Sequence, residues 1–382
     1  MPSDKSYVLF CAGEDSGDVI GEALVKAVLA EGRFAAVGCG GSRMQKAGLR
    51  PVVDYEDLPV SGFGDVLPKY FKLRKSFAAL KSALESPDCL GLVAIDYPGF
   101  NMKLTKRAGE LHKRVLYVAP PQVWAWKRRR ATELAKNPFV RLAVFFDFEE
   151  RVFREAGCNV VRVRHPFFNS EFGIQSSELN NSVCLDSKSD DFLEDSLSSK
   201  KLLLPGSRKA QALRNLPIFL RAVADSQNVV VVAARQELVP AFEKFGVQVV
   251  VAPQNAEERM ELYRSASFAI SAPGTATLEL ALSGIPFAVC TKPDLLTYGL
   301  GRLFVKTKYF ALPNIVLDRS VFPEYIVAPF SRDKEMQRWF ATVAALPRDD
   351  VRGELRQKLA VGNSLQDLAL EFLGELVEGE SQ

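Results

Sequence analysis

Short apolar runs alternate along this chain with longer segments in which apolar residues recur every three to four positions. In the first half these runs are Tyr7 to Cys11, Phe34 to Val37, Leu90 to Ile95, Arg114 to Val118, Leu142 to Phe145 and Asn159 to Arg162. In the second half they lie at 201–204, 228–234, 247–252, 268–272 and 287–290. Buried strands that alternate with amphipathic helices are typical of parallel βαβ units.

The pattern is interrupted once, between residues 169 and 199, where Ser, Asp and Asn dominate. Such a composition predicts a segment that connects two domains. We therefore predict an α/β fold in which two Rossmann-like, doubly wound domains, residues 1–168 and 200–332, face each other across a cleft. The remaining segment, residues 333–382, is expected to be helical and to pack back on the domains.

The composition describes an ordinary globular protein. At 382 residues the chain is long enough for about two domains of roughly 100 to 200 residues each. A net charge of +3 does not favour a nucleic-acid partner. The six cysteines show neither CxxC spacing nor a histidine cluster, which favours a reduced cytoplasm over disulfides or a zinc site. The N-terminus lacks the pattern of a signal peptide and no window reaches the apolar length of a membrane span, so we expect only peripheral membrane contact.

The first glycine turn, AGEDSGD at residues 12–18, is acidic. A helix N-terminus after such a turn often binds phosphate, but carboxylates at the same place oppose an anion. We expect Glu14, Ser16 and Asp18 to offer oxygens to sugar hydroxyls or to neighbouring backbone N–H groups. Ser16 or Asp18 as the cap of its own helix is the alternative.

The second domain repeats the strand and glycine turn with the opposite charge. Gly206, Ser207 and Arg208 follow an apolar strand and can bind an anion through backbone N–H groups, a hydroxyl and a guanidinium. A further turn places Gly274 and Thr275 before a helix, with Glu279 in its first turn. Glu279 can accept hydrogen bonds from a ribose, or only complement the helix dipole.

Two common nucleotide motifs are missing from the chain. It contains neither the GxGxxG fingerprint nor the GxxxxGK[ST] loop, which counts against a dehydrogenase and a P-loop kinase.

Asp96 is the candidate general base because it ends the strand LGLVAID, where open α/β sheets place functional groups. Capping the next helix is its alternative role. His165 is the second candidate base, while His112 lies in a polar helical pattern and is expected at the surface.

Two segments combine aromatic and basic side chains. One of them, residues 60–84, contains Phe63 and Phe71 among lysines and arginines, which suits a lipid substrate or an anionic membrane surface. The other contains Trp124 and Trp126 before a basic run that includes Arg128. The cations of this run suit an acceptor phosphate. Alternatively, the first segment is an ordinary helix that faces the core, and the cations of the second segment are only exposed to solvent.

The ordered motifs of the chain resemble those of the lipid-A-disaccharide synthase family over roughly residues 5–330. They are AGEDSGD (12–18), VGCGGSRMQKAG (37–48), DYPGFNMKL (96–104), APPQVWAWKRRR (119–130), LLPGSR (203–208), SAPGTATLE (271–279) and VKTKYFALPNIVLDRSVFPE (305–324). The chain departs from the family in Asp15, in Arg164 before His165-Pro166, and in the missing second acid after Asp96.

The resemblance implies a GT-B glycosyltransferase of family 19. It would condense UDP-2,3-diacylglucosamine with 2,3-diacylglucosamine 1-phosphate to give lipid A disaccharide 1-phosphate and UDP, with inversion. It also favours Asp96 as base and adds Asn314 and Glu324 to the UDP-sugar site. It implies a cytoplasmic enzyme, peripheral on the inner face of the inner membrane of a Gram-negative bacterium, and leaves a homodimer open.

Metal-independent catalysis is expected because the chain has no Asp-x-Asp pair to bind a divalent ion on a diphosphate. We expect no cofactor and no metal. The alternatives are a UDP-sugar epimerase of the same fold, another UDP-sugar-dependent transferase and a non-enzymatic nucleotide-sugar-binding protein.

Overall fold

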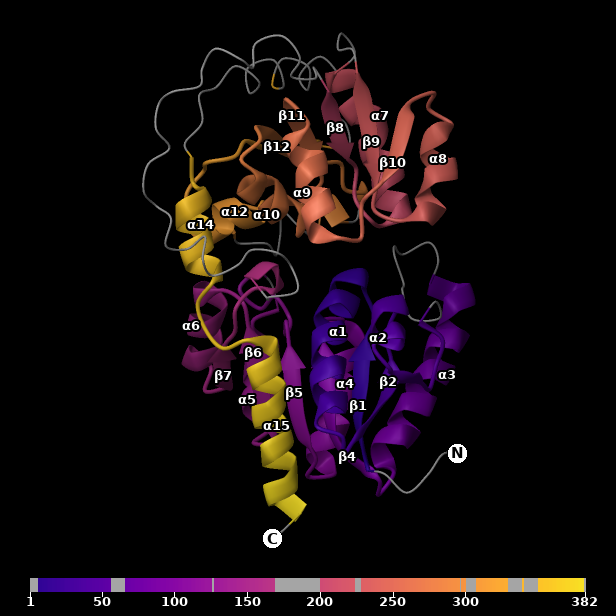
Figure 1. The fold of residues 1–382 in the computed structure, drawn as a ribbon, viewed down its shortest axis with the longest axis vertical. Helices are drawn as coiled ribbons and strands as arrows, with labels where there is room; N and C mark the ends of the chain where they lie inside the picture. Colours follow the sequence, from indigo (N-terminus) through magenta and orange to yellow (C-terminus); the bar gives the residue numbers. More distant parts are fainter. Residues whose placement is uncertain are drawn as a thin grey trace. The chain divides into compact units, whose positions relative to one another are not determined.

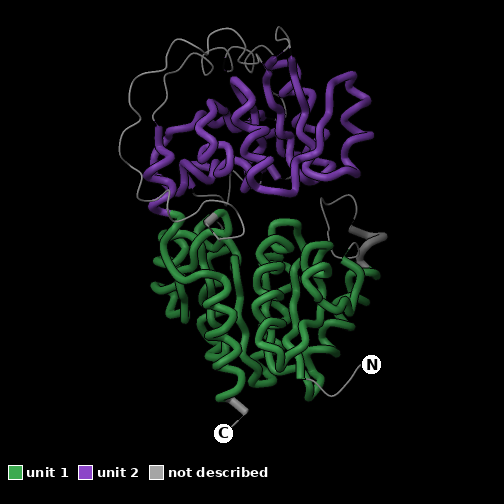
Figure 2. The backbone as a smooth tube through the Cα atoms, viewed as in Figure 1, with its two compact units in different colours: residues 1–169, 359–382 green, residues 170–358 purple. Residues whose placement is uncertain are grey.

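The computed structural model of the chain comprises two compact units. Unit 1 is Met1–Asn169 with Leu359–Gln382, and unit 2 is Ser170–Lys358 (Figure 2). The predicted C-terminal segment, residues 333–382, is therefore divided between the units. The structure describes residues 6–55, 66–125, 127–168, 200–223, 228–295, 297–299, 307–328, 339 and 350–380, so the predicted connection at 169–199 lies outside the described residues.

Unit 1 contains a seven-stranded parallel sheet in the order β3-β2-β1-β4-β5-β6-β7 (Figure 1). The strands are β1 (Tyr7–Ala12), β2 (Ala35–Cys39), β3 (Arg50–Pro51), β4 (Cys89–Ile95), β5 (Arg114–Val118), β6 (Val140–Val144) and β7 (Asn159–Arg162). The helices are α1 (Asp15–Ala30), α2 (Ser42–Lys46), α3 (Val66–Glu85), α4 (Pro98–Glu110), α5 (Arg129–Ala135), α6 (Asp147–Glu155), the short η3 (Pro166–Phe168) and α15 (Leu365–Glu380).

Unit 2 contains a six-stranded parallel sheet in the order β10-β9-β8-β11-β12-β13. Its strands are β8 (Lys201–Leu204), β9 (Val229–Ala233), β10 (Gln248–Val251), β11 (Phe268–Ser271), β12 (Phe287–Thr291) and β13 (Glu324–Ile326). Its helices are α7 (Lys209–Ala222), the short η6 (Gln236–Leu238), α8 (Val239–Glu243), α9 (Ala256–Arg264), α10 (Ala276–Ser283), α12 (Leu312–Leu317) and α14 (Arg352–Leu359), the last of which ends at the boundary between the units.

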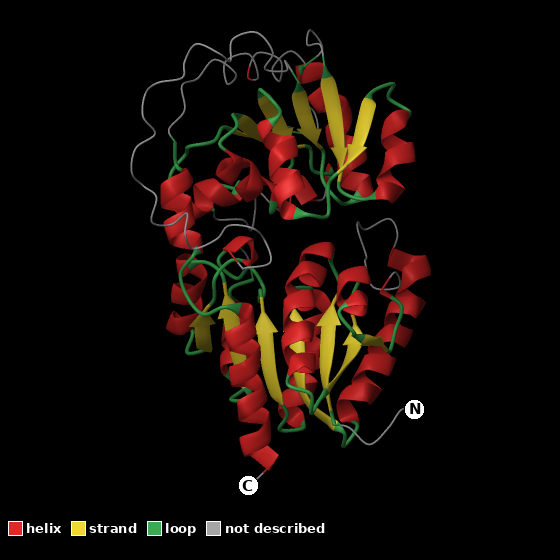
Figure 3. Cartoon of the chain, in the orientation of Figure 1, coloured by secondary structure: helices red, strands yellow, loops and turns green. Residues whose placement is uncertain are grey.

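Helices cover both faces of each sheet, as a doubly wound fold requires (Figure 3). Strands that are covered on both sides consist of continuous apolar runs rather than alternating ones, as in β1, YVLFCA, and β9, VVVVA. These runs carry the sequence signal, and every strand that the pattern predicts is present. The strands β3 and β13 were missed because they contain only two and three residues and lie at sheet edges.

The C-terminal helix α15 completes unit 1. The Arg141 guanidinium on β6 contacts Glu371 at 2.6 Å and Glu375 at 3.0 Å. Phe372 and Leu376 lie against Gly91 of β4, where even a Cβ would come within 2.8 Å of the leucine. Ion pairs and apolar packing thus attach the end of the chain to the sheet.

The order of the strands reverses at one point in each sheet, between β1 and β4 in unit 1 and between β8 and β11 in unit 2. Open α/β sheets bind ligands beyond the carboxyl ends of the strands at this point. All four turns that follow these strands carry residues that the sequence singled out. They are the acidic glycine turn after β1, Asp96 after β4, Gly206 to Arg208 after β8 and Gly274 to Thr275 after β11.

Candidate functional site

Asp96 occupies a strained turn between β4 and α4. Asp96 and Tyr97 both adopt left-handed backbone conformations, with φ of 46° and 48°. Two consecutive non-glycine residues in this region cost conformational energy, and such strain persists only where the surroundings enforce it, often at functional sites. The turn therefore supports a functional role for Asp96 beyond capping the next helix.

Two buried side chains hold this turn in place. The side-chain amide of Asn101, on the first turns of α4, donates to the carbonyl oxygens of Cys11 at 3.1 Å, Ile95 at 3.1 Å and Asp96 at 2.8 Å. The Tyr117 hydroxyl on β5 donates to the same Asp96 carbonyl at 3.0 Å. The sequence did not predict this role for either residue, although Asn101 lies inside the DYPGFNMKL motif.

The acidic glycine turn lies directly beside the Asp96 turn. A Cβ at Gly13 would come within 2.6 Å of the Tyr97 ring, so only glycine lets the two turns approach this closely. Glu14 is half-buried and Ser16 is exposed at the start of α1. Asp15, one position further than Glu14, accepts a hydrogen bond from the Tyr55 hydroxyl at 3.2 Å.

Asp18 offers its oxygens to backbone N–H groups, which is one of the two roles that the sequence predicts for it. Its carboxylate is buried and accepts hydrogen bonds from the backbone N–H groups of Arg43 and Met44, each at 3.1 Å. Burial raises the pKa of the Asp18 carboxyl, against the lowering effect of these N–H groups. Asp18 thus caps the N-terminus of α2 rather than that of its own helix, because the β2–α2 loop folds over it.

His165 lies in an aromatic pocket of unit 1. Its ring packs on Phe145, Phe146 and Phe167, with ring centroids 5.2, 5.9 and 4.3 Å away, and its Nδ1 accepts from the Phe167 N–H at 3.5 Å. Burial, with a further contribution from Arg162, lowers the pKa of His165 to about 3. The imidazole is therefore neutral at physiological pH and a weak proton acceptor, which favours Asp96 as the base.

Glu149 is a buried carboxyl that the sequence analysis did not single out. It lies in the first turn of α6 and accepts from the Phe145 N–H at 3.3 Å. Burial raises its pKa to about 7, while the Phe145 N–H and the nearby Trp124 indole lower it. The Trp124 N–H nevertheless lacks a partner in hydrogen-bond geometry, and its ring packs edge-on against Phe148.

We expect Glu149→Gln to make the stability of unit 1 less sensitive to a rise in pH from acidic to neutral. Below about pH 4.5 the wild-type carboxyl is protonated in both the folded and the unfolded chain. Between pH 4.5 and 7 only the folded state keeps the proton, so wild-type stability falls as pH rises to about 7. Between pH 5 and 8 the free energy of unfolding of Glu149→Gln should therefore rise, relative to wild type, by about 2 to 3 kcal/mol.

Urea unfolding at both pH values measures this difference. Glu150→Gln is the control, because Glu150 lies on the same helix and pairs with Arg154 at the surface. An equal change in the control, or no change in Glu149→Gln, would contradict the prediction.

The aromatic and basic segments are only partly described. Phe71 on α3 is 74% exposed beside the exposed Lys72, Arg74 and Lys75. Trp124 is half-buried, and Arg128 pairs with Glu155 at 3.2 Å on the surface. Phe63 and Trp126 lie outside the described residues.

Unit 2 places a glycine turn after β8. Gly206 has a φ of 114°, which favours glycine, and Arg208 is the exposed N-cap residue of α7. Ser207 is exposed as well, and its carbonyl accepts from Arg235 at 3.3 Å. The Ser207 hydroxyl and the Arg208 guanidinium are thus exposed at the carboxyl end of β8, beside the start of a 14-residue helix.

The neighbouring turn after β11 leads into α10. Gly274 has a φ of 154°, and Thr275 is the N-cap residue of the helix; both are exposed. The carboxylate of Glu279 does not stand alone in the first turn, because Arg259 on α9 binds it at 2.7 Å. The sequence carried no local signal for this pair, since its members are 20 positions apart.

Asn314 and Glu324 hold a loop together. The Asn314 side chain is fully buried; its amide donates to Phe322 and Glu324, and its oxygen accepts from the N–H groups of Val321 and Phe322. Because all its hydrogen-bonding capacity is used, the expected direct contact of Asn314 with a UDP-sugar is corrected to a supporting role. Glu324 is half-buried and also accepts from the N–H groups of Phe310 and Ala311, at 3.0 and 2.8 Å.

Among the described residues there is no helix with the length and apolar character needed to cross a membrane. In the same part of the chain, no three His, Cys, Asp or Glu residues gather in a way that could hold a metal ion.

A family model for lipid-A-disaccharide synthetase matches residues 8–361 of the chain. The chain belongs to the lipid-A-disaccharide synthase family. It is 34% identical over 334 residues to the lipid-A-disaccharide synthase of Trichlorobacter lovleyi, covering 84% of this chain and 83% of that protein. It is also 30% identical over 400 residues to the lipid-A-disaccharide synthase of Nitrosococcus oceani, covering 100% of this chain and 99% of that protein.

The fold is also found among solved structures. Arabidopsis thaliana UGT89C1 superimposes with a TM-score of 0.58 at 14% identity, covering 98% of this chain and all of the other. The two parallel-sheet units have the GT-B fold, as predicted. As a member of the lipid-A-disaccharide synthase family, the chain is a glycosyltransferase of lipid A biosynthesis, which confirms the resemblance found in its motifs.

Proposed function

We propose that this glycosyltransferase transfers the 2,3-diacylglucosamine of a UDP donor to the 6-hydroxyl of 2,3-diacylglucosamine 1-phosphate, with inversion at the anomeric carbon. The bond from the acceptor oxygen to the anomeric carbon forms as the bond to the diphosphate breaks, and UDP leaves. The observation that carries the proposal is the strained Asp96 turn at the switch point of unit 1, in a chain of this family.

Asp96 accepts the proton of the 6-hydroxyl in this proposal. It is half-buried at the carboxyl end of β4, and its backbone is held by Asn101 and Tyr117. A carboxylate fixed in this way can act as a general base in one step with the attack. Glu14 and Ser16, on the adjacent turn, would bind the hydroxyls of the acceptor sugar.

The donor is assigned to unit 2. Gly206, Ser207 and Arg208, together with the turn at Gly274 and Thr275, would bind the diphosphate through N–H groups, a hydroxyl and a guanidinium. Their positions at the carboxyl ends of β8 and β11 support this assignment. Glu279 would accept a hydrogen bond from the ribose, and Glu324 with Asn314 would support the loop between them.

The lipid chains and the membrane are assigned to the two segments of unit 1 that combine aromatic and basic side chains. The exposed Phe71 and its cationic neighbours on α3 suit an anionic lipid surface. Phe63, Trp124, Trp126 and Arg128 are assigned to the lipid and the acceptor phosphate. The enzyme would then act as a peripheral protein on the inner face of the inner membrane, and a homodimer stays open.

Incubation with UDP-2,3-diacylglucosamine, with and without 2,3-diacylglucosamine 1-phosphate, tests the reaction. We expect UDP and a disaccharide 1-phosphate only when both substrates are present. Conversion of the donor without the acceptor would indicate an epimerase. Binding without conversion in either mixture would indicate a non-enzymatic binding protein.

We expect EDTA to leave the rate of this reaction unchanged, because arginine and helix N-termini take the place of a metal on the diphosphate. Initial rates with and without the chelator check this. A loss of rate that Mg²⁺ or Mn²⁺ restores would show that the diphosphate is bound through a metal.

Arg208→Ala and Glu279→Gln should weaken UDP binding in different ways. Because Arg208 is exposed, its removal should reduce UDP affinity by about tenfold, or ~1.4 kcal/mol, and leave uridine affinity unchanged. Glu279→Gln should weaken uridine and UDP equally, by about 1 to 2 kcal/mol. Calorimetric titration of both variants with both ligands measures this. UDP binding by Arg208→Ala at the wild-type level would show that the turn after β8 does not bind the diphosphate.

A further inference from the structure

The carboxylate of Glu279 lies at the centre of a buried network that joins α9 to α10. Arg259 Nε donates to both carboxylate oxygens at 3.0 Å, and Arg259 Nη2 donates to Oε1 at 2.7 Å. The Tyr263 hydroxyl donates to Oε2 at 3.1 Å. The Arg259 and Glu279 side chains are only 16% and 13% exposed, and Tyr263 is buried.

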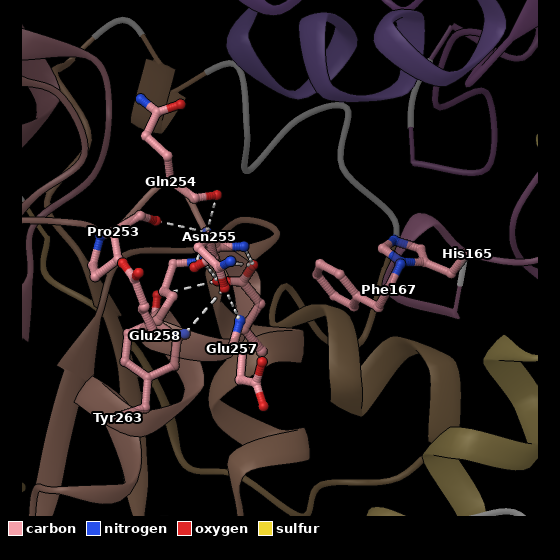
Figure 4. A network of polar contacts seen from close by, with 10 residues as sticks. His165, Phe167, Pro253, Gln254, Asn255, Glu257, Glu258 and Tyr263 are labelled. Atoms are coloured by element: carbon pink, nitrogen blue, oxygen red, sulfur yellow. Dashed lines mark hydrogen bonds and ion pairs between the residues drawn. The ribbon is translucent and has the colours of Figure 1, made fainter. Parts of the chain in front are cut away.

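The same guanidinium also fixes the loop before α9. Arg259 Nη1 donates to the carbonyl oxygens of Pro253 at 2.8 Å, Gln254 at 3.3 Å and Asn255 at 3.5 Å. Asn255 in turn caps α9, because its side-chain oxygen accepts from the N–H groups of Glu257 at 2.8 Å and Glu258 at 3.3 Å (Figure 4). A single arginine therefore joins the β10–α9 loop to the first turn of α10.

The network leaves part of the hydrogen-bonding capacity of the Glu279 carboxylate for a ligand. A carboxylate has about four lone-pair sites. Three hydrogens already point at Glu279: one from Nε, one from Nη2 and one from the tyrosine hydroxyl. Because the single Nε hydrogen is shared between Oε1 and Oε2, it engages each oxygen only partly, and the three hydrogens leave about one of the four sites for a ligand. The fork of the guanidinium restricts the rotation of the carboxylate.

We infer that Arg259 and Tyr263 are positioning residues for the donor nucleoside, which hold the Glu279 carboxylate so that its remaining site accepts a ribose hydroxyl. The inference rests on the proposed role of Glu279 and adds the two side chains that orient it. Burial alone would lower the pKa of Arg259, but its contact with Glu279 raises it, so the guanidinium keeps its charge. Preorganisation of this kind reduces the ordering that the ligand must impose.

Binding of UDP and of 2′,3′-dideoxyuridine 5′-diphosphate tests the inference. Arg259→Lys keeps the charge but cannot form the fork, and we expect it to weaken UDP about tenfold. Tyr263→Phe keeps the buried ring and the ion pair, and we expect about a threefold loss. Neither variant should change the affinity for the dideoxy nucleotide by more than about twofold, because that ligand has no ribose hydroxyl for Glu279.

Arg264→Lys is the matched control, since Arg264 is an exposed arginine on the same helix, and it should bind both ligands like wild type. An equal loss for UDP and the dideoxy nucleotide would show that Arg259 and Tyr263 only stabilise the unit, and would overturn the inference. Unchanged UDP binding in both variants, with weakened binding in Glu279→Gln, would overturn the inference and leave the role of Glu279 intact. Wild-type UDP binding by Glu279→Gln would overturn both.

Discussion

Asp96→Asn should reduce turnover by about 100- to 10,000-fold while UDP binding stays at the wild-type level. The amide has the size of the carboxylate but cannot accept the proton of the attacking hydroxyl. The hydrogen bonds from Asn101 and Tyr117 that hold the turn go to the backbone carbonyl of Asp96, so they survive the substitution. Initial rates with both lipid substrates and calorimetric titration with UDP measure the two effects.

His165→Asn is the control for this prediction, because an asparagine oxygen can replace Nδ1 as the acceptor for Phe167. Since the pKa of His165 is about 3, its imidazole should not carry the proton, and the variant should keep its rate within a few-fold of wild type. More than about a tenth of the wild-type rate in Asp96→Asn would remove Asp96 from the role of base. A large loss in His165→Asn alone would transfer that role to the imidazole.

Asn101→Ala should lower both the stability of unit 1 and the turnover number. The substitution removes one buried donor from the carbonyl groups of Cys11, Ile95 and Asp96, and we expect the free energy of unfolding to fall by about 2 to 4 kcal/mol. The Asp96 turn can then relax from its strained conformation, and we expect kcat to fall about 100-fold. The KM for the UDP donor should stay unchanged. Urea unfolding and steady-state kinetics measure these quantities.

Two further variants separate the effect on the turn from the effect on stability. Tyr117→Phe removes only the hydroxyl that donates to Asp96, and should cost about 1 kcal/mol with a smaller loss of kcat. Asn137→Ala removes an amide that donates to the Thr105 carbonyl at 3.1 Å, in the second half of α4, and should lower stability without lowering kcat. Equal losses of kcat in Asn101→Ala and Asn137→Ala would contradict a specific role for Asn101.

The sequence was sufficient for the strands of both sheets and for their parallel arrangement. In a doubly wound fold each central strand is covered on both faces, so runs such as Leu202 to Leu204 and Val230 to Val232 must be apolar throughout. This requirement is local, so the apolar runs can be recognised in the sequence without knowledge of any tertiary contact. The edge strands β3 and β13 are too short to produce such a run, and only pairing with a neighbour defines them.

The sequence was also sufficient for the turns that carry the candidate site. A glycine turn between a strand and a helix, or an aspartate at the end of a strand, marks the carboxyl end of a parallel sheet, and strand order then brings such ends together. Gly13, Asp96, Gly206 and Gly274 all lie at these ends in the structure. The chemistry of these turns in each unit, however, depends on neighbours that the motifs do not contain.

Tertiary packing decided what the individual side chains of these motifs do. Asp18 and Asn314 are polar residues in family motifs, yet folding places backbone N–H groups against both side chains, and the hydrogen-bonding capacity of Asn314 is fully used. His165 becomes a neutral buried ring because aromatic side chains exclude water from it. Arg259 reaches Glu279 only because α9 packs beside α10. A side chain's charge, partners and exposure depend on residues distant in sequence, so the local pattern predicts where a site lies and the fold determines which of its groups remain free to act.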